Sequence, residues 1–230
     1  MKSIILLLAA LAFAISPFLN PEFGGFDPDR YPIPQIDPPV QPAGYAFAIW
    51  GPIYLWLIVS AIFGLWKRRE DTTWEPMRLP LALSLAVGAA WLPVALISPI
   101  IATVMIWIML LAALAAFDRA PATDTLWAKA PIGLYAGWLT AASFVAVGLL
   151  FAGYGWMSET TASVVCLLGA LALAALVIRH RPSLAYGAAV VWALIAVAAQ
   201  NWAQSWALTA LALGGGALIA VLTALRLQQK

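Results

Sequence analysis

The chain has 230 residues, of which 64% are hydrophobic and only 10% are charged. This composition excludes a water-soluble domain, because a chain of this size could not bury so many apolar side chains. The formal net charge of +2 is too small to indicate binding to nucleic acid. We therefore expect an all-α integral membrane protein.

Eight apolar runs follow one another along the chain, each long enough to cross a hydrocarbon core of about 30 Å as a helix. The predicted spans are residues 3–19, 45–66, 80–97, 100–117, 131–152, 161–178, 184–200 and 206–225. If the amino terminus is cytoplasmic, Arg30 is the only Lys or Arg of the sequence that lies outside. The positive-inside rule therefore predicts that both termini are cytoplasmic, in the inner membrane of a bacterium.

The first run permits a second interpretation. Lys2, a short apolar stretch and the sequence Ala12-Phe13-Ala14 are also typical of a secretory signal peptide with its cleavage site. Removal of this run would leave seven spans that still obey the charge rule. The run is therefore either the first transmembrane helix or a cleaved leader.

Residues 20–44 form the only long polar segment, and they are rich in proline. Proline at this density favours extended and turn geometry, so we expect an ordered external loop and not a helix. Long loops in compact bundles often serve as lids. We expect this loop to cover a pocket formed by spans two to five.

The sequence predicts no catalytic residues and no metal ligands. His180 is the only histidine, and it lies beside Arg179 and Arg181 at the end of the sixth run, where an interfacial anchor is the simpler interpretation. The single cysteine, Cys166, lies inside an apolar run, as core cysteines do. Enzymatic activity stays open, and no cofactor is certain.

Aromatic residues are the main functional signal. Phe47, Trp50 and Tyr54 recur at helical spacing, and Gly51 and Pro52 follow Trp50. Further aromatic residues lie deep in spans three to five, whereas six tryptophans at run ends fit an interfacial belt: Trp66, Trp74, Trp127, Trp156, Trp202 and Trp206. An aromatic stripe can be either packed core or a ligand site, and the spacing alone leaves both open.

Small residues predict where helices touch. Gly133, Gly137 and Ala141 form a small-xxx-small row in span five, which is typical of close helix contacts in membranes. Leu139 is expected to face lipid or a loosely packed neighbour. If the chain is an accessory subunit of a larger membrane complex, the expected contact surfaces are Gly214, Gly215, Gly216 and Ala220 of span eight, with Gly133 and Gly137 of span five.

Three segments resemble one family: PAGYAFAIWGPIYLWL (42–57), AAWLPVALISP (89–99) and PIGLYAGWLTAASF (131–144). They are similar to the TspO/MBR family of tryptophan-rich sensory proteins, which is related to the mitochondrial translocator protein. The resemblance implies a five-helix bundle in residues 1–152, and residues 153–230 add three spans. It also implies a pocket under the first loop for porphyrins, sterols or similar flat apolar molecules.

We therefore expect a membrane protein that binds a flat hydrophobic ligand, such as a porphyrin or another tetrapyrrole, in order to sense or handle it. The expected ligand-binding residues are Phe47, Trp50, Tyr54, Trp91, Trp107, Tyr135 and Trp138. A small-solute transporter and an accessory subunit of a larger membrane complex are the alternatives. The expected partners are membrane lipid and a hydrophobic small molecule, and a homodimer or a partner in a membrane complex stays open.

Overall fold

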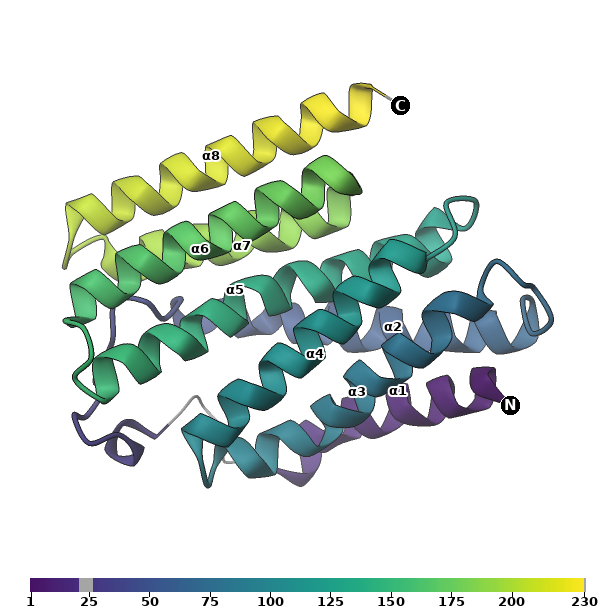
Figure 1. Ribbon diagram of the computed structural model, residues 1–230, viewed down its shortest axis with the longest axis horizontal. Helices are drawn as coiled ribbons and strands as arrows, with labels where there is room; N and C mark the ends of the chain where they lie inside the picture. Colours follow the sequence, from purple (N-terminus) through teal and green to yellow (C-terminus); the bar gives the residue numbers. More distant parts are fainter. Residues whose placement is uncertain (21–26, 230) are drawn as a thin grey trace. The chain divides into compact units, whose positions relative to one another are not determined.

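The computed structural model describes residues 1–20 and 27–229, and within them it is built from helices (Figure 1). The long helices are α1 (Lys2–Leu19), α2 (Trp50–Trp66), α3 (Glu75–Ala95), α4 (Pro99–Arg119), α5 (Ala130–Gly153), α6 (Glu159–His180), α7 (Leu184–Asn201) and α8 (Trp206–Gln228). Short helical turns η1 (Pro28–Arg30), η2 (Gly44–Ile49) and η3 (Thr125–Lys129) connect them. All eight long helices in the described part of the chain are long and apolar enough to cross a membrane. The predicted eight-span, all-α fold is confirmed.

The chain divides into two compact units. The first unit is Met1–Phe26 with Ile49–Ala136, and the second unit is Asp27–Ala48 with Gly137–Lys230. Helix α5 contributes its first turns to the first unit and the remainder to the second. The predicted division after residue 152 falls near the end of α5 and stays a prediction.

Four helices begin at serine residues that cap their first turn. The hydroxyl oxygens of Ser98, Ser158, Ser183 and Ser205 each accept a hydrogen bond from the backbone N–H three residues later. Such caps satisfy an amide that the helix itself leaves without a partner. Helix α3 begins at Glu75, five residues before the predicted start, because proline is well tolerated in the first turn, where Pro76 lies.

In the first unit, α1 packs against α3 and α2, and α3 packs against α4. Pro93 lies inside α3 and has no N–H to donate to the carbonyl of Ala89, four residues earlier. The Ser16 hydroxyl of α1 donates to that carbonyl at 2.8 Å. A serine on the neighbouring helix therefore satisfies the backbone group that the proline leaves free, as the interior of a membrane requires.

A polar network ties together the loops at one end of the first unit. The Asp124 carboxylate accepts hydrogen bonds from the Arg68 guanidinium and, at 2.8 Å, from the Trp74 indole N–H. The Arg68 hydrogen bond and charge hold the pKa of the Asp124 carboxyl below its ordinary value. Trp74 is fully buried, so its expected place in an exposed interfacial belt is wrong. Its indole N–H faces a carboxylate inside the protein and not the membrane surface.

In the second unit, α7 and α8 pack along each other, and α6 contacts both (Figure 1). The predicted contact at Gly137 is present: a Cβ atom built there would lie 2.5 Å from the Tyr186 carbonyl oxygen of α7. Nearby, the hydroxyl groups of Thr140 and Tyr186 are hydrogen-bonded at 2.8 Å. Leu139 is fully buried, because α5 is buried around much of its circumference. This contradicts a lipid-facing position, which was one of the two expected for it.

Residues 27–48, called the proline-rich segment below, belong to the second unit and bond to its helices. Backbone bonds join Ile33 to Gly153 of α5 and Ala43 to Ala196 of α7. The Asn201 side chain donates to the Pro39 carbonyl at 2.8 Å. The ordered loop that the prolines predicted is therefore present in these residues; residues 21–26 of the predicted loop lie outside the described part.

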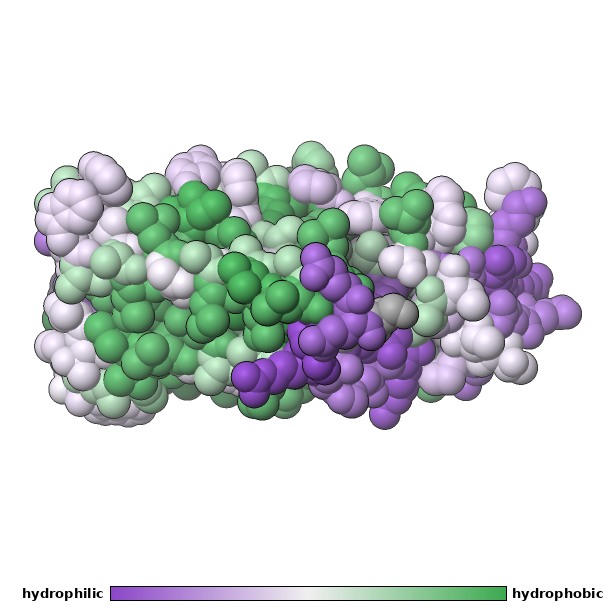
Figure 2. Space-filling view, turned by 90° about the horizontal axis from the view of Figure 1, so that it is seen from above, coloured by the Kyte–Doolittle hydropathy of each residue, from purple (hydrophilic) through white to green (hydrophobic). Residues whose placement is uncertain are grey.

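Large apolar side chains cover the outer sides of the helices. On α8, Leu213, Leu218, Val221 and Leu225 are all exposed. Figure 2 looks onto the side of the second unit that carries α8, and hydrophobic residues dominate much of that face whereas hydrophilic residues gather toward one end. Exposed apolar surface of this extent is stable in lipid and not in water. The chain is an integral membrane protein.

Candidate functional site: an aromatic cluster in the first unit

Trp50 and Tyr54 form a stacked pair at the beginning of α2. Their ring centroids are 5.4 Å apart and their planes differ by 15°. The helix brings them together because residues four positions apart lie on the same face. The pair therefore presents two nearly parallel rings, as the sequence spacing predicted.

Phe13 of α1 completes the cluster, although its place there was not predicted from the sequence. Its ring lies edge-on to Trp50 and Tyr54, with centroid distances of 5.7 and 5.0 Å, and also contacts Tyr135 at 5.6 Å. Gly88 of α3 makes room for it, since a Cβ atom on Gly88 would lie 2.6 Å from the Phe13 ring. The buried positions of α1 at Leu6, Ala10 and Phe13 have helical spacing, and this pattern was the available signal.

Tyr135 of α5 lies at the buried side of the cluster, and its ring centroid is 6.4 Å from that of Trp50. Its hydroxyl is 2.9 Å from the Ser84 hydroxyl, and Ser84 in turn donates to the Met109 carbonyl at 2.7 Å. Because the single Ser84 proton is used on Met109, Tyr135 donates to Ser84. This chain of hydrogen bonds fixes the Tyr135 ring against α3 and α4.

The cluster is open on one side. Trp50 and Tyr54 are half-buried, whereas Tyr135 is fully buried. Gly51 and Pro52 beside Trp50 are exposed, and a Cβ atom on Gly51 would meet no other atom within 4 Å. Because Gly51 has no side chain, a flat molecule can approach the Trp50 ring and the adjacent backbone closely.

The other expected site residues have different surroundings. Phe47 and Trp138 lie edge to face in the second unit, with centroids 6.0 Å apart. Trp91 of α3 is half-buried and donates its indole N–H to the Ala102 carbonyl at 2.8 Å. Trp107 is a half-buried residue of α4. The structure thus assembles Trp50, Tyr54 and Tyr135 in one described cluster, and whether any of the seven residues binds a ligand stays a prediction.

The cluster offers stacking surface, dispersion contacts and a few hydroxyl groups, which together suit binding of an uncharged apolar molecule. Within residues 1–20 and 27–229, no group of three or more His, Cys, Asp or Glu side chains is placed to hold a metal ion. The aromatic rings are therefore the groups with which a site here would act.

Comparison with known families gives one match. The model of the family described as "TSPO-like protein" matches residues 3–225, which is nearly the whole chain. No curated protein and no solved structure matches the sequence. The match includes the three carboxyl-terminal helices as well as the first five, and the resemblance drawn from the aromatic motifs is confirmed.

Proposed function

Because the chain belongs to the TSPO-like protein family, we propose that it binds a flat hydrophobic molecule of the tetrapyrrole kind on the aromatic cluster of the first unit, and that it senses or handles this molecule. The observation that supports the proposal most directly is the half-buried Trp50–Tyr54 stack beside the exposed Gly51. A ligand could not reach an aromatic stack inside a sealed core.

In this proposal the ligand extends the stack. A porphyrin ring laid against Trp50 gains dispersion and buries apolar area, and each aromatic pair contributes about 0.5–1.5 kcal/mol beyond that burial. The Phe13 ring, held edge-on by Gly88, and the Tyr135 ring, held by Ser84, keep the stack in place. A receiving surface that is already ordered loses little entropy on binding.

The orientation of the chain in the membrane is part of the same proposal. We infer a bacterial inner membrane with both termini in the cytoplasm, since Arg30 is the only Lys or Arg that this arrangement leaves outside. The proline-rich segment is then on the external side. A ligand would reach the start of α2, which directly follows that segment, from the same side.

The test is a titration of the purified protein in mild detergent with protoporphyrin IX, followed by the shift of the porphyrin's main absorption band. Trp50→Leu is expected to weaken binding about tenfold, near 1.4 kcal/mol, because it removes the stacking face. Trp50→Phe keeps an aromatic face and is expected to retain part of the affinity. Absorption of the porphyrin is the better measurement, because the chain has 12 tryptophans whose fluorescence overlaps.

Trp66→Leu is the matched control, since Trp66 lies on the same helix and is 77% exposed. It is expected to bind as the wild type does. Thermal unfolding of each variant separates lost binding from lost structure. Equal affinity in wild type and Trp50→Leu would show that the cluster is packed core and not a binding site, as would a loss of binding that merely follows a loss of Tm.

A further inference from the structure

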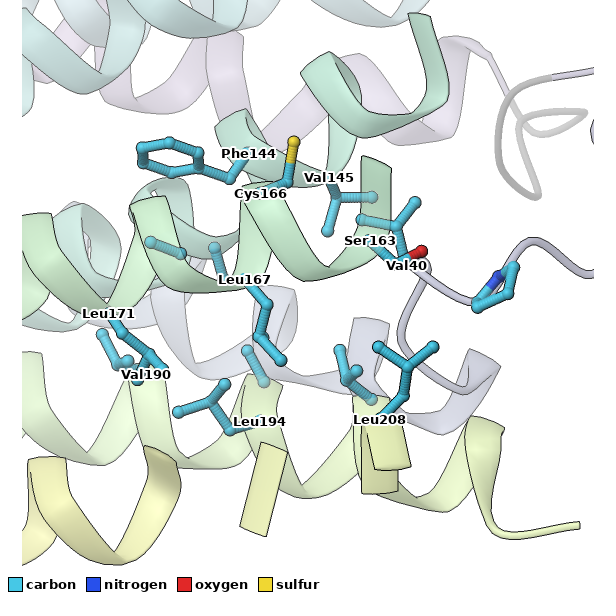
Figure 3. A pocket seen from close by; sticks show the side chains of 15 residues that line it. Val40, Phe144, Val145, Ser163, Cys166, Leu167, Leu171, Val190, Leu194 and Leu208 are labelled. Carbon is cyan, nitrogen blue, oxygen red and sulfur yellow. The ribbon is translucent and has the colours of Figure 1, made fainter. Parts of the chain in front are cut away.

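A second, separate feature lies in the second unit, where four helices and the proline-rich segment enclose a cavity of about 30 Å³. Figure 3 shows side chains from each of these elements around it, among them Val145 of α5, Cys166 of α6, Leu194 of α7, Leu208 of α8 and Val40 of the proline-rich segment. Three of the four helices, α6, α7 and α8, are additional to the five-helix bundle expected from the aromatic motifs.

The cavity wall is almost entirely apolar. Among the lining side chains, only Ser163 and Cys166 carry an oxygen or sulfur atom. Ser163 donates its hydroxyl proton to the Glu159 carbonyl at 2.7 Å, so it offers no donor to a guest. A water molecule needs two to four polar partners to be held in a cavity, and this wall does not supply them. The chemistry of the wall therefore favours a hydrocarbon guest.

A buried polar side chain, that of Asn201, is bonded to two residues that line this apolar space. The Asn201 amide nitrogen donates at 2.8 Å to the carbonyls of both Pro39 and Val197, and both of these residues line the cavity. Asn201 is fully buried, yet its side-chain oxygen Oδ1 accepts no hydrogen bond from any described residue. A buried acceptor without a donor is costly, so a guest that supplies a hydroxyl there is favoured.

The burial of the lining residues indicates where a guest would enter the cavity. Val145 and Leu171 are only half-buried, so the wall is not sealed where they stand. Val40, in contrast, is held closely against α5, because a Cβ atom on Gly148 would lie 2.8 Å from the Val40 side chain. The volume suffices for roughly two water-sized groups. The cavity can therefore hold a portion of one alkyl chain, whereas a ring system such as a porphyrin does not fit.

We propose that this cavity is a second binding site, for a neutral amphiphile that has one alkyl or isoprenoid chain and a terminal hydroxyl group. The hydroxyl donates to Asn201 Oδ1, the first carbons fill the cavity, and the rest of the chain leaves past the half-buried Leu171 toward the surrounding lipid. The site is independent of the aromatic cluster, since all of its residues belong to the second unit.

The experiment uses the whole protein in detergent and a ten-carbon alcohol that carries an aliphatic diazirine. After irradiation, mass spectrometry measures cross-linking to peptides of α6 and α7. Unlabelled 1-decanol is expected to lower this cross-linking with at least fivefold higher potency than decane, because decane cannot donate to Asn201. Ala193→Leu, which fills the cavity from α7, is expected to lower cross-linking at least fivefold.

Ala199→Leu adds the same side chain on the same helix at an exposed position and is expected to label as the wild type does. Trp50→Leu is also expected to label normally, so that failure of the tetrapyrrole proposal and failure of this one are distinguishable. If Ala193→Leu and Ala199→Leu label equally, the cavity is not a binding site. Equal competition by decane and decanol in the wild type overturns the role of Asn201. This comparison uses the wild type alone, so it does not depend on whether a variant folds.

Discussion

Gly137 of α5 lies directly against the backbone of α7, and this contact makes a quantitative prediction. We expect Gly137→Ala to destabilise the protein. A Cβ atom at position 137 would lie 2.5 Å from the Tyr186 carbonyl oxygen and 2.9 Å from the Ala189 Cβ, although real Cβ atoms essentially never approach another atom closer than 3.0 Å. The obstacle is backbone, so it cannot rotate away as a side-chain end could.

The magnitude follows from the separation that the helices must accept. To relieve the clash they must move apart by about 0.5–1 Å, which forfeits a quarter to a half of the dispersion energy along the seam. Overpacking of this kind typically costs about 1–3 kcal/mol. The higher helix propensity of alanine returns up to about 1 kcal/mol. The net loss is therefore about 1–2 kcal/mol, and Gly137→Leu should lose more.

Gly214→Ala is the matched control. Gly214 is exposed on α8, and a Cβ atom there would meet nothing within 4 Å. This variant keeps the propensity gain without the clash, so its Tm should be equal to or higher than that of the wild type. Thermal unfolding in detergent measures both, and a loss of 1–2 kcal/mol corresponds to roughly 2–8 °C in a protein of this size. If the two variants unfold at the same temperature, Gly137 is not at a tight helix contact.

Four further predictions concern other parts of the molecule. Asp124→Ala should cost about 1–3 kcal/mol, measured by thermal unfolding, because it leaves the buried Trp74 indole N–H without its acceptor. Since the pKa of Asp124 is lowered in the fold, the stability that its charge contributes is present above the ordinary carboxyl pKa and is lost as the pH falls through the lowered value. The wild type should therefore lose more stability on acidification than Asp124→Asn does, and an equal or smaller loss would contradict this. Gly88→Ala should push the Phe13 ring against the aromatic cluster and weaken protoporphyrin binding several-fold, with unaltered binding as the contrary result. Reporter fusions at the carboxyl terminus and in the proline-rich segment should lie on opposite sides of the membrane; activity of both on one side contradicts the proposed topology.

Hydropathy and helical periodicity predicted what depends on local sequence. The eight spans follow from the apolar runs, and the Trp50–Tyr54 stack follows from their four-residue spacing. Gly137 was identified because a row of small residues favours close helix contact. For the spans and for the Trp50–Tyr54 pair, the residues that determine the structure lie on the same helix. For Gly137, the signal is the absence of a side chain.

What could not be predicted depends on contacts between distant parts of the chain. Phe13 joins the cluster only because α1 packs against α3, where Gly88 leaves space. Trp74 was assigned to the membrane surface because it stands at the end of an apolar run, but its position is set by Asp124, fifty residues away. Leu139 was expected to face lipid or a loosely packed neighbour, because periodicity cannot show that a helix is enclosed on several sides.

The attachment of the proline-rich segment has a consequence for how the protein is made. Pro39 is bound by Asn201, which lies 162 positions later in the chain. At a synthesis rate of about 5–20 residues per second, the ribosome needs about 8–32 s to reach that asparagine after it has added Pro39. For this time the segment lacks α7, and the bonds that α7 makes to it form only when that helix has entered the membrane. The last third of the chain therefore decides when an element near its beginning takes its final form.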